Sequence, residues 1–248
     1  MKTKILFSIL LSLLFLSPAE AQKRLLFDLS HGQCKGRSYL GDVVPDYRRM
    51  AADNGAEFVI NENQPLTAAI LKGVDVVLML SPLQHDLQKD ITPEEAEALV
   101  KFIKRGGALL VFVDEESHRT HLDKYNINAV TKPFGIEFGD DNPIPSNCGA
   151  VSFINDIFSA RHEVPCSGMR SVKGGTPASV CMEDGYLHST YIKLKNGGKL
   201  FACSETMVGL LMGGGDVERK ARATFNKTDW FGKDSYKYME ELIAWAFR

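Results

Sequence analysis

The chain has 248 residues, of which 44% are hydrophobic and 24% are charged, and its formal net charge at pH 7 is −2. This composition is typical of a folded globular protein and excludes a disordered tail, a collagen-like chain and a polytopic membrane protein. A nearly neutral chain also lacks the concentrated lysine and arginine that phosphate recognition needs, so no nucleic-acid partner is expected.

The first 21 residues have the three parts of a secretory signal peptide. Lys2 and Lys4 give a positive start, an apolar run covers 5–16, and Ala19-Glu20-Ala21 is an A-x-A cleavage signal. The apolar run is too short to span a membrane comfortably. We therefore expect cleavage after Ala21, a secreted or periplasmic mature chain, and no membrane insertion after the signal is removed.

In chain order, the mature sequence alternates apolar strands with helices. The pattern predicts strands at 24–28, 56–60, 74–80, 108–113 and 199–204, and helices at 38–53, 65–72, 92–105, 121–134 and 235–247. Continuous apolar strands between helices are typical of a parallel sheet covered on both faces. We therefore expect an α/β fold over 22–248, a single flavodoxin-like, doubly wound domain with a mainly parallel sheet and an irregular β-rich excursion at about 140–195.

The clearest local signal is the start of the helix at 92–105. Thr92 can cap this helix, Pro93 suits its first position, and Glu95 can complete a capping box. Gly106 and the glycine that follows it are expected to end it.

Five cysteines lie in the mature chain: Cys34, Cys148, Cys166, Cys181 and Cys203. An exported compartment permits disulfides, and one or two are expected; the odd number leaves at least one cysteine unpaired within the chain. Three of the five are near one another in sequence, and the pairing stays open. The sequence contains no C-x-x-C motif, which excludes a zinc ribbon or a thioredoxin-type site.

Four of the predicted strands end in polar residues. These ends are 28–33, 81–85, 114–118 and 204–205, and four of the six histidines lie in or near them. Ligands of open α/β sheets bind at the carboxyl ends of the strands, so we expect these side chains to meet at one rim. The residues expected to act in catalysis are Glu115, Glu116, His31 and His118. Those expected to bind a ligand are Gln33, Ser81, His85, Ser204 and Glu205.

Glu115 and Glu116 are the candidates for acid/base chemistry. Two carboxylates can cleave a glycosidic bond when their environments separate their pKa values and their spacing suits one mechanism. Adjacent residues usually point in different directions, so one of the two is expected in the site rather than both. The alternative is that both are solvated charges that cap the following helix.

Metal binding and nucleophilic catalysis have less support in the sequence. The possible ligands of a divalent ion are His31, Asp114, His118 and His121. No motif such as H-E-x-x-H gives them a tight spacing, so neither a metal nor a cofactor is expected. Ser117 and His118 are sequence neighbours, which rarely act as nucleophile and base, and the chain has no G-x-S-x-G motif.

The stretch from Val74 to Phe138 carries a family resemblance. It contains a Ser81-Pro82 break after a strand, the helix entry Ile91-Thr-Pro-Glu-Glu, the segment Phe102-Ile-Lys-Arg-Gly-Gly-Ala-Leu-Leu-Val-Phe and the later Phe134-Gly-Ile-Glu-Phe. In these features the chain resembles the class I glutamine-amidotransferase-like superfamily. It looks closest to the domain shared by gliding-associated ABC-transport components and an intraflagellar-transport subunit. The resemblance covers most of the mature chain, except residues 140–195, and implies one amidotransferase-like α/β domain.

The resemblance stops at the catalytic residue. True amidotransferases carry a cysteine after the strand that corresponds to 108–113, whereas this chain has Glu115, Glu116 and Ser117 at that turn. Glutaminase activity is therefore not implied. Relatives without the cysteine are regarded mainly as binding or scaffolding modules, some with suspected carbohydrate ligands, and a fold alone does not choose a function.

The leading expectation is an exported domain that binds a carbohydrate or similar small polar ligand at the carboxyl-end rim of the sheet. One alternative is a periplasmic glycan-processing hydrolase or lyase that uses Glu115 or Glu116 with His31 or His118. Another alternative is a protein–protein interaction module of a transport or envelope complex. The sequence leaves the ligand, the catalytic activity and the oligomeric state open.

Overall fold

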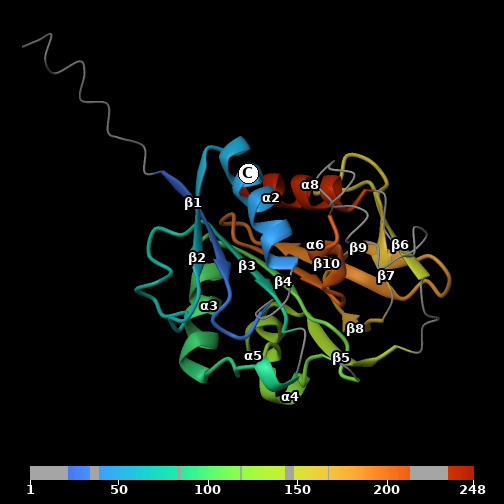
Figure 1. The fold of residues 1–248 in the computed structure, drawn as a ribbon, viewed down its shortest axis with the longest axis horizontal. Coiled ribbons are helices and arrows are strands. Elements are labelled where there is room, and N and C mark those ends of the chain that lie inside the picture. Colours follow the sequence, from blue (N-terminus) through green and yellow to red (C-terminus); the bar gives the residue numbers. More distant parts are fainter. Residues whose placement is uncertain are drawn as a thin grey trace, which may run out of the picture.

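A nine-stranded sheet organises the structure (Figure 1). The computed structural model describes residues 22–33, 39–82, 85–117, 119–142, 148–166, 168–212 and 234–248, so the predicted signal peptide lies outside it. The strands are β1 (Lys23–Asp28), β2 (Ala56–Asn61), β3 (Val76–Leu80), β4 (Ala108–Phe112), β5 (Glu137–Asp141), β6 (Cys148–Ser152), β7 (Glu163–Cys166), β8 (Arg170–Lys173), β9 (Thr176–Cys181), β10 (Leu187–Lys193) and β11 (Lys199–Cys203). The helices are α2 (Tyr39–Asp53), α3 (Pro93–Lys104), α4 (Leu122–Tyr125), α5 (Asn128–Thr131), α6 (Met207–Leu210) and α8 (Ser235–Phe247), with short 3-10 turns η1 (His85–Leu87) and η2 (Lys132–Phe134).

Five strands form the parallel half of the sheet, in the order β2-β1-β3-β4-β11. Numbered along the chain, these five strands have the order 2-1-3-4-5 of flavodoxin-like folds, so the predicted fold class is confirmed. The strand order reverses between β1 and β3. The carboxyl ends of these two strands, at Asp28 and just before Ser81, therefore flank the position where such folds bind ligands.

The four strands β10, β9, β6 and β7 continue the same sheet with antiparallel pairing, and we call them the wing. The β-rich character predicted for about 140–195 is therefore found, but most of its strands extend the main sheet instead of packing onto it. Strands β5 and β8 form a separate two-stranded ribbon.

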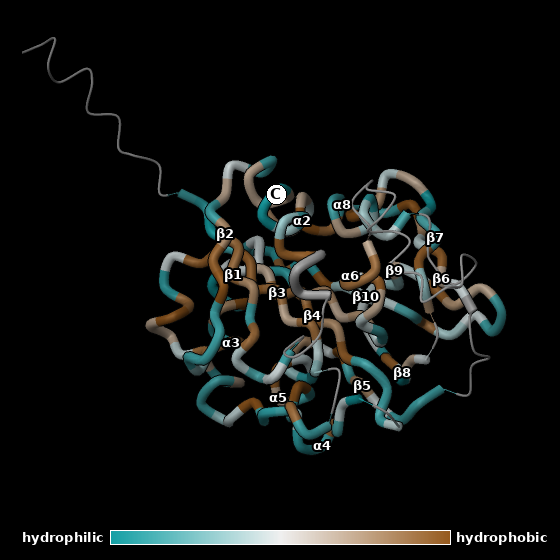
Figure 2. The backbone as a smooth tube through the Cα atoms, viewed as in Figure 1, coloured by the Kyte–Doolittle hydropathy of each residue, from teal (hydrophilic) through white to brown (hydrophobic). Residues whose placement is uncertain are grey.

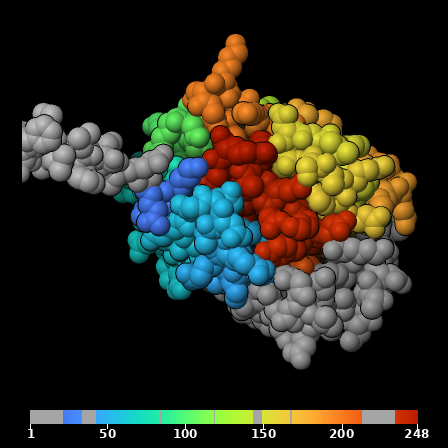
Figure 3. Space-filling model, turned by 90° about the horizontal axis from the view of Figure 1, so that it is seen from above, coloured from blue at the N-terminus to red at the C-terminus, as the bar shows by residue number. Residues whose placement is uncertain are grey.

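Both faces of the parallel half are buried, as the run of apolar residues in β3 shows. Val76, Leu78 and Leu80 belong to one core cluster, whereas Val77 and Met79 belong to the other. The first cluster includes residues of α2, α6 and α8, and the second includes residues of α3, α4 and α5. Figure 2 shows the central strands in the hydrophobic colour, and Figure 3 shows α8 (red) beside α2 (blue) and the wing residues (yellow).

Helix α3 begins as the sequence predicts. The Oγ1 of Thr92 accepts a hydrogen bond from the Glu95 backbone (3.2 Å), and the Glu95 carboxylate accepts one from the Thr92 backbone (3.0 Å). The capping box is therefore complete, and Pro93 occupies the first turn.

Two predicted helices take another form. Residues 65–72 make turns, with one helical hydrogen bond from the Leu71 N–H to the Thr67 carbonyl (3.0 Å), so the expected helix is not formed. The predicted helix at 121–134 is divided into α4, α5 and η2. Helix α4 ends at Asn126, which adopts a left-handed conformation (φ 59°). The side-chain Nδ2 of Asn126 donates a hydrogen bond to the Ile91 carbonyl (3.0 Å).

Candidate functional site

Polar side chains gather in three groups at the carboxyl ends of the parallel strands. The first group surrounds Asp28 at the end of β1. The second joins Asp114 and Glu205, which follow β4 and β11. The third surrounds Glu116 and lines a pocket beside the β5–β8 ribbon.

Asp28 is the centre of the first group. Its Oδ1 accepts hydrogen bonds from Ser30 Oγ (2.7 Å) and Asn61 Nδ2 (2.8 Å). Its Oδ2 accepts from Gln33 Nε2 (2.9 Å) and lies 2.8 Å from His31 Nδ1. All five side chains are buried. A buried carboxylate with these donors is satisfied, so the group fixes the loop that follows β1.

His31 lies between two carboxylates. Its Nδ1 faces Asp28, and its Nε2 is 3.3 Å from Oε1 of Glu95. Burial lowers the pKa of the imidazole, but the hydrogen bonds and negative charges of Asp28 and Glu95 outweigh burial, so the pKa of His31 is raised. Both ring nitrogens therefore act as donors. This arrangement holds a charged imidazole in place and does not favour the role of a general base.

Gly32 allows this loop to approach η1 closely. Its φ is +88°, and a Cβ at this position would lie 1.8 Å from the Leu87 carbonyl oxygen. A cavity of about 160 Å³ adjoins the loop, and its lining includes Ser30, His31 and Lys89. The cavity is small for an oligosaccharide, so the first group is a weaker candidate than the third.

The second group connects the ends of β3, β4 and β11. Ser81 Oγ accepts a hydrogen bond from the Asp114 backbone (2.9 Å) and lies 2.9 Å from Thr206 Oγ1. Arg119 Nε is 3.3 Å from Oδ2 of Asp114, within ion-pair distance but outside hydrogen-bond geometry. Glu205 accepts a bond from the Val208 backbone (3.3 Å). We call Asp114 and Glu205 the acid pair.

Both members of the acid pair bind protons more tightly than ordinary carboxylates. Burial raises the pKa of Asp114 to about 6, although the charge of Arg119 opposes the rise. Burial, followed by the negative charge of Asp114, raises the pKa of Glu205 well above its usual range. Asp114 is 2% and Glu205 1% exposed, which keeps them from a substrate in this conformation.

Glu116 is the centre of the third group. Its Oε1 is 2.9 Å from His121 Nδ1, and its Oε2 accepts a hydrogen bond from the Leu122 backbone (2.8 Å). Burial raises its pKa, but the bonds from Leu122 and His121 and the charge of Arg170 outweigh burial, so the pKa is lowered. Glu116 is therefore an ionised acceptor, and a general acid at neutral pH would need the opposite shift.

Arg170, on β8, connects this group to the neighbouring strands. Its guanidinium is buried and donates to the carbonyls of Asp114 (2.6 Å), Thr120 (2.7 Å) and Gly139 (3.2 Å). It also lies 3.4 Å from Oε2 of Glu116. One side chain of β8 thus holds the loop after β4 and strand β5 in a fixed relation.

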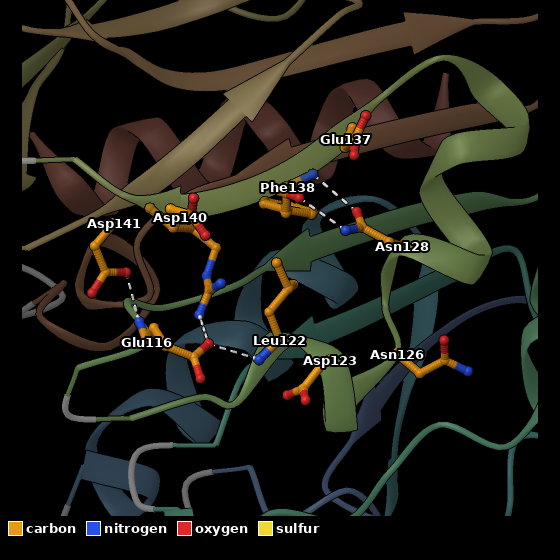
Figure 4. Close-up of a pocket in the computed structure, with 10 residues that line it drawn as sticks. Glu116, Leu122, Asp123, Asn126, Asn128, Glu137, Phe138, Asp140 and Asp141 are labelled. Atoms are coloured by element: carbon orange, nitrogen blue, oxygen red, sulfur yellow. Dashed lines mark hydrogen bonds and ion pairs between the residues drawn. The ribbon is translucent and has the colours of Figure 1, made fainter.

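The pocket beside Glu116 has a volume of about 840 Å³ (Figure 4). Its walls come from the loop after β4, from α4 and α5, and from the β5–β8 ribbon. It is lined by Glu116, Leu122, Asp123, Asn126, Asn128, Glu137, Phe138, Asp140, Asp141 and Arg170. Five of these ten residues are carboxylates and one is cationic, so the pocket is strongly negative.

Two histidines stack next to this pocket. The rings of His85 and His121 lie 3.7 Å apart between centroids at an interplanar angle of 20°. His85 Nε2 is 2.9 Å from the Glu116 carbonyl oxygen, which assigns the donor role to this nitrogen. Both histidines contact Glu116, and His85 belongs to η1, so the stacked pair connects the Glu116 loop to η1.

The structure distributes the predicted site residues among all three groups. His31 and Gln33 lie in the first, Ser81 and Glu205 in the second, and Glu116 and His85 in the third. Ser204 is buried, and its hydroxyl donates to the His188 carbonyl (2.9 Å). Glu115 is half-buried beside Gly168, where a Cβ would lie 2.3 Å from its Oε2. His118 lies outside the described residues.

Three residues that organise these groups were not among the predicted site residues. Asp28 and Asp114 belong to the polar strand ends that the sequence predicts to meet at the rim, and Asp114 was a possible metal ligand, but neither was expected to be the centre of a group. Arg170 has no comparable sequence signal, because it lies in a short strand of the β-rich excursion and reaches its partners only in the folded chain.

Cys203 is buried at the end of β11. Burial and the negative charge of Glu205 raise the pKa of Cys203 well above its usual range, so its thiol stays protonated. The strand register places Cys148 opposite Cys166. Cys34 lies outside the described residues, and the pairing of the cysteines stays open.

Among the described residues, no group of three or more His, Cys, Asp or Glu side chains has the arrangement of a metal site. No helix in this part of the chain has both the length and the apolar character needed to cross a membrane.

Comparisons with known proteins identify the fold. No model of a known protein family matches the chain, and no curated protein matches it by sequence. Among solved structures, the mmIFT52 N-terminal domain is similar with a TM-score of 0.56 and 16% identity, covering 74% of this chain and 86% of that one. A Salmonella typhimurium LT2 protein described as cytoplasmic has a TM-score of 0.57 and 12% identity over 89% of this chain and 98% of that one.

A ThuA-like protein of Bacteroides uniformis is also similar, with a TM-score of 0.50 and 13% identity, covering 77% of this chain and 84% of that one. These likenesses support the amidotransferase-like fold that the sequence resemblance implies. At such low identity they concern the fold alone.

Proposed function

We propose that this chain is an exported binding domain that takes a small hydroxyl-rich ligand, such as a carbohydrate, in the pocket beside Glu116. The observation that carries the proposal is the pocket itself. About 840 Å³ of space lies at the carboxyl-end side of β4, and half of its lining residues are carboxylates. A pocket of this volume suits a small ligand. It lies on the carboxyl-end side of the sheet, as ligand sites of open α/β folds do, but beyond β4 and not at the switch point between β1 and β3.

The charge of the lining selects among polar ligands. Sugar hydroxyls donate hydrogen bonds, and carboxylates accept them with about 1.5–3 kcal/mol each. Asp140 is exposed, and Asp123 lies on α4 at the opposite wall, so both can accept from a ligand. The same charges repel uronic acids and sulfated sugars. The ligand is therefore a neutral or amine-bearing sugar in this proposal.

Binding has more support in the geometry than glycan hydrolysis. A glycosidase needs one carboxyl group with a raised pKa to protonate the leaving group. The pKa of Glu116 is lowered, and both ring nitrogens of His31 face carboxylates. The acid pair has raised pKa values but is buried. Hydrolysis would require these residues to rearrange.

The finer family placement is also a proposal. The sequence resemblance is to the domain shared by gliding-associated ABC-transport components and an intraflagellar-transport subunit, and the similarity to the mmIFT52 N-terminal domain supports it. The signal-peptide pattern at 1–21 supports export to the periplasm or the medium.

Titration calorimetry with neutral, amine-bearing and uronic oligosaccharides tests the function. We expect binding of a neutral or amino sugar, and a loss of roughly ten- to 100-fold in affinity for the double variant Asp123→Asn/Asp140→Asn, since each change weakens a charged acceptor. Asp53→Asn is the matched control, because Asp53 is an exposed carboxylate at the end of α2. No binding across the panel, or a double variant that binds as the wild type does, would overturn the proposal.

A further inference from the structure

The large hydrophobic side chains that the described residues leave exposed all lie on the wing. Phe153 (39% exposed) and Ile154 (69%) follow β6, and Met182 (50%) and Tyr186 (37%) lie between β9 and β10. Such side chains are unremarkable when scattered singly over a surface. All four lie in one half of the sheet, in connections at the two opposite ends of the β6–β9 strand pair, and this confinement indicates an interaction surface.

These connections flank one pair of strands. Val151 of β6 is paired with Val180 of β9, and both are half-buried, whereas the adjacent Ala150 and Cys181 are buried in the core. Because side chains alternate along strands, Val151 and Val180 lie on the face of the wing that the core does not cover. Met182 continues this face, since its backbone donates to the Gly149 carbonyl (2.9 Å).

The outer edge of the wing is closed to further strands. In β7, the backbone polar groups of Glu163 and Pro165 point away from β6. The Ser152 N–H donates to the His162 carbonyl, and the backbone groups of an antiparallel strand alternate in direction from one residue to the next. The Glu163 backbone is already bonded to Asp234 through both its N–H (3.0 Å) and its carbonyl (3.1 Å). Pro165 has no N–H to offer. A partner therefore meets the face of the wing and not its edge.

A groove of about 750 Å³ runs over this face. Its lining combines the apolar side chains of Val151, Val180 and Met182 with three charged residues, Arg161, Glu163 and Asp234. The groove thus carries one cation and two carboxylates beside an apolar centre. Phe153 shares the face of Val151 by the same alternation, and we call this groove, together with Phe153, the wing face.

We propose that the wing face is the interface of a symmetric dimer of this chain. A two-fold axis that passes between Arg161 and Glu163 brings each Arg161 to the partner's Glu163, so a surface with both charges is complementary to its own copy. The same rotation lays the apolar centre of one groove on that of the other. The acidic pocket beside Glu116 has no residue in this interface, so the dimer does not depend on the proposed ligand.

Sedimentation velocity over a concentration series of the purified chain tests the dimer. We expect a species of twice the chain mass to dominate at roughly 100 µM, as for interfaces of modest size. Met182→Lys and Phe153→Lys both place a charge on an exposed position of the wing face, so both variants should fold and sediment as monomers. Far-UV circular dichroism and a thermal melt verify the fold of each.

A charge-swap experiment identifies the interface. Arg161→Glu and Glu163→Arg should each weaken self-association at least tenfold, and an equimolar mixture of the two variants should form a heterodimer again. Lys72→Glu makes a similar charge change on an exposed residue between β2 and β3 and should leave the dimer unchanged. A monomer at every concentration would overturn the proposal. A dimer that survives the lysine variants, or a mixture that stays monomeric, would overturn it too.

Discussion

The acid pair makes a quantitative prediction about stability and pH. The pKa of Asp114 is raised from 3.8 to about 6, chiefly by burial, so ionisation is less favourable in the folded state than in the unfolded state. Between these values the folded state binds more protons, and stability therefore falls as pH rises. The shift corresponds to a contribution of about 3 kcal/mol to the free energy of unfolding. This stabilisation is fully present below pH 4 and is lost once the pH exceeds about 6.

Asp114→Asn removes the charge while it keeps the shape of the side chain. We expect the variant to gain about 3 kcal/mol in free energy of unfolding, relative to wild type, between pH 4 and pH 8. The measurement is urea denaturation of both proteins at the two pH values, followed by circular dichroism. His188 acts in the opposite direction, since burial lowers its pKa to about 3, but it is present in both proteins and cancels from the difference. Glu205 does not cancel: the variant lacks the negative charge that raises the pKa of Glu205, so this residue adds to the gain.

The exposed Asp53 provides the control for this experiment. Asp53→Asn should shift the free energy of unfolding by less than about 0.5 kcal/mol at either pH. If Asp114→Asn changes the free energy of unfolding by the same amount at pH 4 and at pH 8, then Asp114 ionises as easily in the folded state as in the unfolded state. The account of the acid pair as a repelling, buried pair would then be wrong.

Three further changes test the supports of the site. Gly32→Ala should cost at least 2 kcal/mol more than Gly55→Ala in urea denaturation, because both glycines have positive φ but only Gly32 would bring a Cβ onto the Leu87 carbonyl; equal costs would contradict this contact. Arg170→Met should cost about 3–5 kcal/mol by the same assay, since it leaves buried acceptors without a donor, and a cost below about 1 kcal/mol would refute its role. Thr92→Ala should lower stability by about 1 kcal/mol, the usual value of a helix cap, and an unchanged denaturation midpoint would show that the cap is dispensable.

Much of the fold follows from local signals in the sequence. The apolar strands at β1, β3 and β4 and the capping box of α3 depend on neighbours in the chain, and all four are found as predicted. The segment at 65–72 was predicted as a short helix, but it makes turns with one helical hydrogen bond. The break at Asn126 depends on a hydrogen bond to Ile91, a residue 35 positions away, which no local pattern contains.

The candidate site was less predictable because its order comes from distant contacts. The strand ends were identified correctly as polar, and the rim position follows from the parallel sheet. Which strand ends meet is decided by the strand order and by Arg170, whose three carbonyl partners come from two separate segments. The sequence also could not separate the satisfied cluster at Asp28 from the open pocket at Glu116, since each has a carboxylate beside a histidine.

The pairing of β4 with β11 has a consequence for how the chain folds during synthesis. Strand β4 is made about 90 residues before β11, its neighbour on one side, so at about 5–20 residues per second the wait is roughly 5–20 s. During this interval a strand whose five residues are all buried in the final structure has one edge unpaired. A chain that stops before residue 199 would keep this central edge open, and such edges are templates for aggregation. The centre of the sheet is therefore protected from aggregation only once β11 has been synthesised and has paired with β4.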